Sequence, residues 1–196
     1  MRIDAGSHKG VKLAVPPGQE VRPTGDRARQ AIFNILAHAH DAIQDAKVLD
    51  AFAGSGALGL EALSRGAERL TLIEADRGAA DAIKQNIAAC REQTRAQLFT
   101  ADALRPPRAT SSNWAPCSLV FLDPPYGKDL VAPAVVALNN AGWISSDALI
   151  VAEMGKRDHF LPPAGFEIVD DRAYGKARVA MLKTRPEPMG PSNRRS

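Results

Sequence analysis

The chain has 196 residues, of which 45% are hydrophobic, and its formal net charge is +3. That length fits one α/β domain with a full core. The apolar runs have only the length of strands, and the first residues lack the apolar core of a secretion signal, which excludes the membrane-spanning and secreted classes. We therefore expect a cytoplasmic protein that does not bind a membrane.

Positive charge is concentrated near the N-terminus. Residues 1–35 carry six positive charges against three negative ones, and the rest of the chain balances at 19 against 19. The six are Arg2, Lys9, Lys12, Arg22, Arg27 and Arg29. Such a surplus indicates contact with a polyanion, although a solvated charged face has the same pattern.

The first expected elements are two short strands, 2–3 and 11–15, which would form a small hairpin outside the main sheet. Thr24 is a candidate cap for a helix whose apolar residues recur at i, i+3 and i+4 spacing up to residue 39. This helix would pack one face inward and leave Arg27, Arg29 or both free.

From residue 47 onwards, strand and helix patterns alternate. The expected strands are 47–52, 70–74, 97–101, 118–122 and 148–153, and the expected helices are 58–65, 77–91 and 130–139. Repeated βα units predict a mostly parallel sheet with helices on both faces. Two late strands, 167–170 and 178–183, would close the sheet as an antiparallel hairpin with a turn of six to eight residues.

These elements predict a single domain over residues 1–183. Residues 1–40 would form an N-terminal extension that carries the basic surplus, and residues 41–183 would form the core of the domain. Residues 184–196 have nothing to bury and are expected to be a disordered tail. Cys90 and Cys117 lack metal-ligand spacing, so we expect reduced, structural thiols and no metal site.

Three glycines stand between a predicted strand and a predicted helix. Gly54, Gly56 and Gly59 have the spacing G-x-G-x-x-G, and Glu74 follows at the end of the next strand. This spacing is typical of dinucleotide sites in which the acid binds ribose hydroxyls, so a nicotinamide oxidoreductase is one interpretation. However, Asp50 lies four residues before the first glycine. A carboxylate repels a pyrophosphate and attracts a sulfonium and an amino group, which favours S-adenosylmethionine.

A further acid follows the predicted strand 97–101. Asp102 could accept a hydrogen bond from the amino group of adenine, and capping of a helix is its alternative role.

The tetrapeptide Asp123-Pro124-Pro125-Tyr126 follows the apolar strand 118–122. Proline fixes φ and has no N–H, so the carbonyls of Asp123 and Pro124 are expected to point outward as acceptors beside the ring of Tyr126. Two acceptors beside a flat ring suit a planar exocyclic amino group, whereas a stiff strand-to-helix turn is the structural alternative. Together with the glycine motif, this predicts methyl transfer to an amino group.

The order of these motifs resembles a known family. They are RPTGDRARQAIFNIL at 22–36, DAFAGSGALGLEALSRGA at 50–67, LIEAD at 72–76, Asp102-Ala103, and DPPY at 123–126. Over residues 2–183 the chain resembles the bacterial family that methylates a guanine N2 in 16S ribosomal RNA. The resemblance implies a class I, Rossmann-like S-adenosylmethionine-dependent methyltransferase with a mostly parallel seven-stranded sheet.

The resemblance also implies the residue roles. The cofactor would be bound by Asp50, Phe52, Gly54, Gly56, Glu74, Ala75, Asp102, Ala103 and Asp123. Catalysis would depend on Asp123, Pro124 and Tyr126, with Pro125 and Tyr126 against the target base. Candidate RNA contacts are Lys9, Lys12, Arg22, Thr24, Arg27 and Arg29. The expected partner is 16S rRNA in the small ribosomal subunit, and the enzyme is expected to be a monomer.

Two alternatives come from other functional classes. A DNA adenine or cytosine amino methyltransferase would use the same DPPY tetrapeptide, but the chain has no extra domain with which to read DNA sequence. A non-catalytic RNA-binding assembly factor could keep the fold, but the intact glycine motif and Glu74 argue against it.

Overall fold

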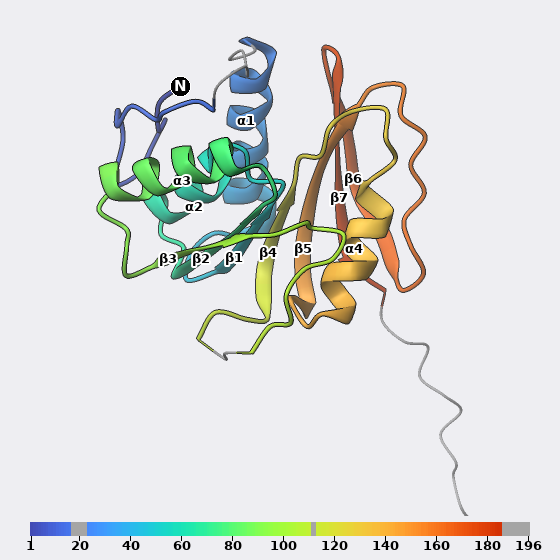
Figure 1. Cartoon of the computed structure of the whole chain (residues 1–196). Helices are drawn as coiled ribbons and strands as arrows, with labels where there is room; N and C mark the ends of the chain where they lie inside the picture. The colour runs from blue at the N-terminus through green and yellow to red at the C-terminus, as the bar shows by residue number, and fades with distance from the viewer. Residues whose placement is uncertain (17–22, 111–112, 186–196) are drawn as a thin grey trace, which may run out of the picture.

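The computed structural model describes residues 1–16, 23–110 and 113–185 (Figure 1). The tail was predicted to begin at Thr184, but Thr184 ends the last strand of the sheet. Residues 186–196 and Arg22 lie outside the described residues. The side chains of Thr24 and Arg27 also lie outside what the structure describes.

A seven-stranded sheet with the order β3-β2-β1-β4-β5-β7-β6 forms the centre of the molecule. The first five strands are parallel, and the last two pair antiparallel with β5 and with each other. The order reverses between β1 and β4, where ligands bind in open α/β sheets. The strands are β1 Lys47–Ala51, β2 Arg69–Glu74, β3 Ala96–Thr100, β4 Cys117–Leu122, β5 Ile144–Gly155, β6 Phe166–Tyr174 and β7 Ala177–Thr184.

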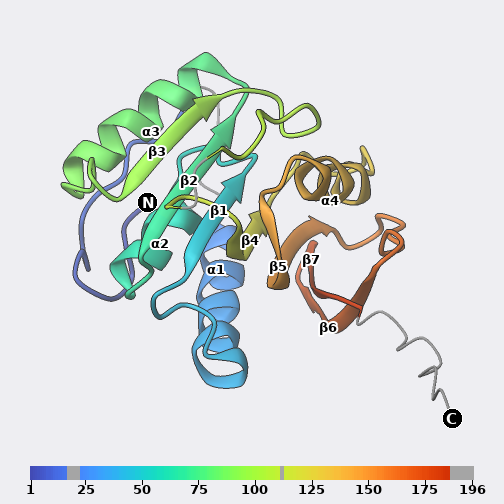
Figure 2. The same ribbon diagram turned by 90° about the horizontal axis from the view of Figure 1, so that it is seen from below.

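Helices cover both faces of the sheet, as predicted from the alternating pattern. Buried residues of α1, α2 and α3 form one core cluster, and α4 packs into a second cluster on the opposite face. The two views show α1 and α4 on opposite sides of the sheet (Figures 1 and 2). The helices are α1 Pro23–Ile35, continued by the π-helical turn η1 Leu36–His40, then α2 Ala57–Ser64, α3 Arg77–Ala89 and α4 Val131–Asn140. Among the described residues, every helix is too short or too polar to cross a membrane.

The N-terminal segment, residues 1–16, is more irregular than predicted. Instead of two paired strands, it has a single antiparallel bridge between Arg2 and Lys12. Ile3 still donates to Val11 and accepts from Gly10. The next two N–H groups, of Asp4 and Ala5, donate to Glu61 of α2 instead, which limits the pairing. Ile3 and Leu13 are buried in the core cluster under α1 and α2, so the segment is an integral part of the fold.

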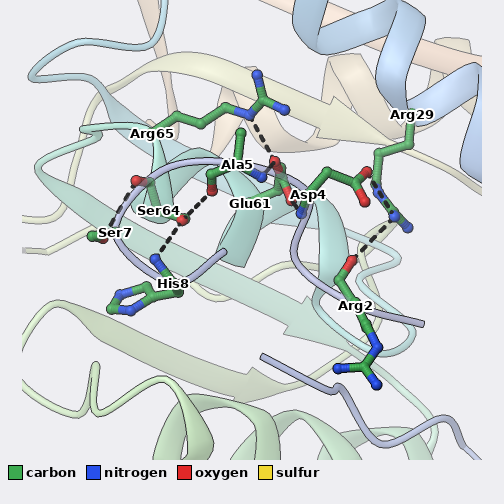
Figure 3. A network of polar contacts seen from close by, with 9 residues as sticks. All are labelled: Arg2, Asp4, Ala5, Ser7, His8, Arg29, Glu61, Ser64 and Arg65. Atoms are coloured by element: carbon green, nitrogen blue, oxygen red, sulfur yellow. Dashed lines mark hydrogen bonds and ion pairs between the residues drawn. The ribbon is translucent and has the colours of Figure 1, made fainter. Parts of the chain in front are cut away.

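A buried carboxylate on α2 fixes the N-terminal segment (Figure 3). The side chain of Glu61 is fully buried. Its two oxygens accept hydrogen bonds from the backbone N–H groups of Asp4 at 2.7 Å and Ala5 at 3.0 Å. Arg65, one turn along α2, donates to the same carboxylate at 2.7 Å. Two backbone donors and one guanidinium therefore offset the cost of burying this charge.

The closing hairpin also differs from the prediction. The strands β6 and β7 reach further than expected, and only Gly175 and Lys176 lie between them. The added length of β6 is mostly exposed and polar, and includes Asp171 and Arg172, so it has no apolar alternation for sequence analysis to detect. Gly175 has φ +60°, which a tight turn of this kind requires.

Candidate functional site

The glycine loop, residues 52–56, connects β1 to α2 through a left-handed backbone. Phe52, Gly54 and Gly56 have φ values of +62°, +56° and +74°. A Cβ on Gly56 would lie 2.8 Å from a methyl carbon of Leu72, so the loop is packed closely against β2. Glycine is thus required at this position both by backbone conformation and by space.

Glu74, at the end of β2, bridges two loops with its carboxylate. One oxygen accepts the N–H of Gly54 at 2.8 Å, and the other accepts the N–H of Asp76 at 2.8 Å. Ala75, which lies between Glu74 and Asp76 in the sequence, is exposed. Each oxygen of Glu74 keeps a further lone pair, so a half-exposed carboxylate is held in place and can still accept from a ligand.

Asp50 lies beneath the glycine loop. It is 1% exposed, and its carboxylate accepts the N–H of Gly59 in the first turn of α2 at 2.9 Å. Burial raises the pKa of Asp50 to about 7, with a smaller upward contribution from the nearby charge of Glu74, and the hydrogen bond from Gly59 opposes both. Asp50 therefore holds the first turn of α2, directly after the glycine loop. Direct contact of Asp50 with a cofactor stays a prediction.

Asp102 follows β3 at the same edge of the sheet. One carboxylate oxygen accepts the N–H of Leu104 at 2.9 Å, and the other pairs with Arg105 at 3.3 Å. The side chain therefore stabilises its own turn while remaining partly exposed, and its neighbour Ala103 is buried. Binding of adenine by Asp102 stays a prediction.

The DPPY turn, residues 123–126, leaves the sheet next to the glycine loop. In the register, Ala51 at the end of β1 pairs with Leu122 at the end of β4. Both strands are parallel, so the two turns emerge at the same edge, at the reversal of strand order. Asp123 and Pro125 are exposed, whereas Pro124 is buried.

Sequence analysis missed the partner of Tyr126. The Tyr126 hydroxyl donates a 2.5 Å hydrogen bond to the Glu153 carboxylate near the end of β5. Leu122 pairs with Ala152 in the register, so Glu153 lies one residue beyond this pair on the strand adjacent to the DPPY turn. An acid at the carboxyl end of a parallel strand was the signal that could have indicated it.

The predicted basic residues have different environments. Lys9 and Lys12 are exposed and available to a polyanion. The prediction for Arg29 was wrong, because this residue is 7% exposed and donates to the carboxylate of Asp4 at 3.0 Å and to the carbonyl of Arg2 at 3.2 Å. Arg29 therefore joins α1 to the N-terminal segment (Figure 3).

The family is shown by sequence comparison. The family model described as "Conserved hypothetical protein 95" matches residues 1–183. A protein named "Ribosomal RNA small subunit methyltransferase D" from Escherichia coli strain K12 is 37% identical over 185 residues, which cover 93% of this chain and 89% of the relative. The chain belongs to the small-subunit rRNA methyltransferase D family. The "Putative rRNA methyltransferase YlbH" of Bacillus subtilis strain 168 is 34% identical over 187 residues, which cover 94% of this chain and all of that relative.

Solved structures agree with this family. A structure described as a putative methyltransferase, yhhF, from Escherichia coli has a TM-score of 0.79 at 36% identity and covers 94% of this chain and 98% of its own. A ribosomal protein L11 methylase from Lactobacillus delbrueckii shares the fold alone, with a TM-score of 0.62 at 12% identity over 89% of this chain and 85% of its own. The predicted class I methyltransferase fold with its seven-stranded, mostly parallel sheet is therefore confirmed.

The charge at the sheet edge limits which cofactor this family member can hold. Asp50, Glu74 and Asp102 stand at the ends of three neighbouring strands, β1, β2 and β3. The carboxylates of Glu74 and Asp102 repel a pyrophosphate and suit a ligand that carries hydroxyl, amino or cationic groups, whereas the buried Asp50, with its pKa raised to about 7, adds little charge. Within the described ranges, no three His, Cys, Asp or Glu side chains are grouped to hold a metal ion.

Proposed function

We propose that this chain transfers a methyl group from S-adenosylmethionine to the exocyclic N2 of a guanine in 16S rRNA of the small ribosomal subunit. The observation that carries the proposal is the adjacency of two turns at the switch in strand order: the glycine loop after β1 and the DPPY turn after β4. The printed names of the relatives supply the substrate class.

The residues at the sheet edge fit S-adenosylmethionine by their chemistry. Glu74 is fixed by two backbone N–H groups and half-exposed, so it can accept from ribose hydroxyls. Asp102 can accept from adenine, and Asp50 would support the site by holding the first turn of α2. Phe52, Gly54, Gly56, Ala75, Ala103 and Asp123 would complete the site. When bound, the cofactor supplies an electrophilic methyl group on a sulfonium.

The DPPY turn would bind and orient the amino group that accepts the methyl. The N2 of guanine is a poor nucleophile because its lone pair is delocalised into the ring. The Asp123 carboxylate and the Pro124 carbonyl would each accept one N–H, which directs the nitrogen lone pair away from the turn. Catalysis is then mostly orientation and electrostatics, and the proton lost by the methylated nitrogen passes to water.

Aromatic stacking would hold the target base in place. The Tyr126 ring, beside Pro125, would stack on the guanine, which is worth about 1–3 kcal/mol for a base on an aromatic side chain. A guanine inside a duplex cannot reach a sheet edge, so the target must be unstacked or in a loop. Lys9 and Lys12 are exposed candidates for phosphate contacts, together with Arg22, Thr24 and Arg27.

The test is methyl transfer from labelled S-adenosylmethionine to undermethylated small subunits, naked 16S RNA and duplex DNA, followed by nucleoside analysis. We expect N2-methylguanosine from the subunit or the RNA. Asp123→Ala should lower the rate about 100-fold or more and leave cofactor binding nearly intact, because Asp123 is only one of the residues proposed to hold the cofactor. Asp81→Ala, at an exposed site on α3, is the matched control. Label in DNA alone, or normal turnover by Asp123→Ala, would refute the proposal.

A further inference from the structure

A hollow with a volume of about 60 Å³ lies beside the DPPY turn and opens to solvent. Its walls come from Pro124 and Pro125 of the turn, from the start of α4, from Met154 on β5 and from residues 158–161. β5 lies on the far side of β4 from β1, so the hollow and the glycine loop are on opposite sides of the turn. It is therefore separate from the edge at which the carboxylates of β1, β2 and β3 gather.

The hollow has mixed walls, in which apolar side chains stand beside Asp129, Asp158 and His159. Val131, Met154 and Phe160 are buried in its walls, and Leu161 is 70% exposed at its rim. Among the described residues, Leu161 is the most exposed of the large hydrophobic side chains. An open hollow of this size has room for one flat ring, such as a nucleobase, against the apolar side chains and not for a larger ligand.

The segments that form the hollow are tied together by one carboxylate. An Asp158 oxygen accepts the N–H of Gly127, after the DPPY turn, at 3.0 Å, and the N–H of Gly155, at the end of β5, at 2.8 Å. Arg178 also donates to the backbone carbonyl of Asp158. The hollow is thus built on fixed backbone beside the DPPY turn.

The surroundings of the hollow are positively charged. Residues 127–130, 155–161 and 175–176 carry four cations, Lys128, Lys156, Arg157 and Lys176, against two acids, Asp129 and Asp158. The four cations are exposed. The 175–176 turn belongs to the same surface, because the N–H of Lys156 donates to the carbonyl of Lys176 at 2.8 Å. A surplus of two positive charges around this hollow favours a ligand with a flat base and phosphates.

We infer that the hollow binds an unpaired nucleotide adjacent to the target guanine in the RNA chain. The base would enter between Leu161 and Pro125, where Asp129 at the wall can accept from an amino group of the base. Lys128, Lys156 and Arg157 would contact the phosphates. This inference rests on the proposed function, because the DPPY turn fixes where the target guanine lies. The nucleotide would hold the RNA strand after the target has left its stack.

The test compares full-length variants by RNA affinity and by methyl transfer. Leu161→Ala removes the apolar rim, and Val169→Ala, on the exposed face of β6, is its matched control. Leu161→Ala should weaken binding to naked 16S RNA, and raise the KM for RNA, about tenfold, as loss of a base contact does. The kcat and the affinity for S-adenosylmethionine should stay within about twofold of wild type.

A second variant tests the phosphate contacts. The double change Lys156→Ala and Arg157→Ala should lower the slope of log RNA affinity against log salt concentration by about 2. Lys84→Ala on α3 should leave this slope unchanged.

The two readouts separate this inference from the proposed function. Weaker RNA binding by Leu161→Ala supports the hollow even if wild type methylates none of the offered substrates. Unchanged RNA affinity with normal methyl transfer in wild type overturns the inference and leaves the proposed function intact. Leu161→Ala could instead lose activity on assembled subunits while its affinity for naked RNA stays unchanged. That result would mean that the hollow binds a side chain of a ribosomal protein, and it would also overturn the inference.

Discussion

The strands β1, β2 and β3 present their functional side chains differently from β4 and β5. On the first three, the carboxylates Asp50, Glu74 and Asp102 each accept a backbone N–H from a nearby turn. On the other two, Asp123 is exposed and Tyr126 is held by another side chain. On the proposed cofactor side, backbone donors hold the three acids themselves. On the proposed substrate side, backbone donors bind Asp158 outside the DPPY turn, and a side-chain contact holds the ring of Tyr126. Specificity for the acceptor can therefore change without rebuilding the loops that hold the cofactor.

The N-terminal segment strengthens this contrast. It is attached to α2, the helix that begins at the glycine loop, through Glu61 and Ser64. Asn86 on α3 extends the attachment, because its amide bonds both the N–H and the carbonyl of Ala14, and also the carbonyl of Ser55 in the glycine loop. On the substrate side, by contrast, the loop after β5 carries the exposed Leu161.

The largest expected effect is on stability. Glu61→Ala removes the acceptor of two backbone N–H groups and leaves Arg65 without its buried partner. The free energy of unfolding should fall by about 3–5 kcal/mol, as when one member of a buried ion pair is removed. Urea unfolding monitored by circular dichroism measures this change.

Glu68→Ala is the control for Glu61→Ala. Glu68 is exposed and has only a long contact of 3.9 Å with Arg69, so its loss should change the free energy of unfolding by about 0.5 kcal/mol or less. Equal effects of the two variants would show that the N-terminal segment does not depend on its buried carboxylate, and the contrast between the two sides would weaken.

The next effect is a dependence of stability on pH. Burial raises the pKa of Asp50 from its ordinary value of about 3.9 to about 7 in the folded protein, so the folded state binds more protons between these values. Its contribution to stability is complete below pH 4 and is lost as the pH rises towards 7. Relative to Asp50→Asn, wild type should lose up to about 1.4 kcal/mol per pH unit in this window. Parallel profiles of the two proteins from pH 4 to 7 would contradict a buried, proton-binding Asp50.

Much of the fold could be predicted because its signals are local. The glycines of the β1–α2 turn, the apolar strands and the helical spacing all act over a few residues, so each of the five parallel strands was placed to within a few positions. The start of β5 at Ile144 and the polar part of β6 were missed. In both regions pairing with neighbouring strands, rather than local apolar alternation, determines the structure.

The site was predictable in its motifs but not in its pairings. Asp50, Glu74 and the DPPY turn stand at strand ends that the alternating pattern already located. Arg29 was misjudged because its partner Asp4 is 25 residues away in the chain, and no spacing rule connects them. Glu153 was missed for the same reason, since its contact with Tyr126 exists only once β4 and β5 are side by side.

The smallest expected effect tests the side-chain support of the substrate side. Tyr126→Phe and Glu153→Ala each remove the hydrogen bond that fixes the ring, and each should lower kcat about tenfold while the affinity for S-adenosylmethionine stays within about twofold. Tyr174→Phe, at the only other tyrosine of the chain, is the control. If the hydrogen bond carries the effect, the double variant should be no slower than either single one. If the kcat losses of the two single variants instead multiply in the double variant, Tyr126 and Glu153 act independently. The ring would then be positioned by its own packing.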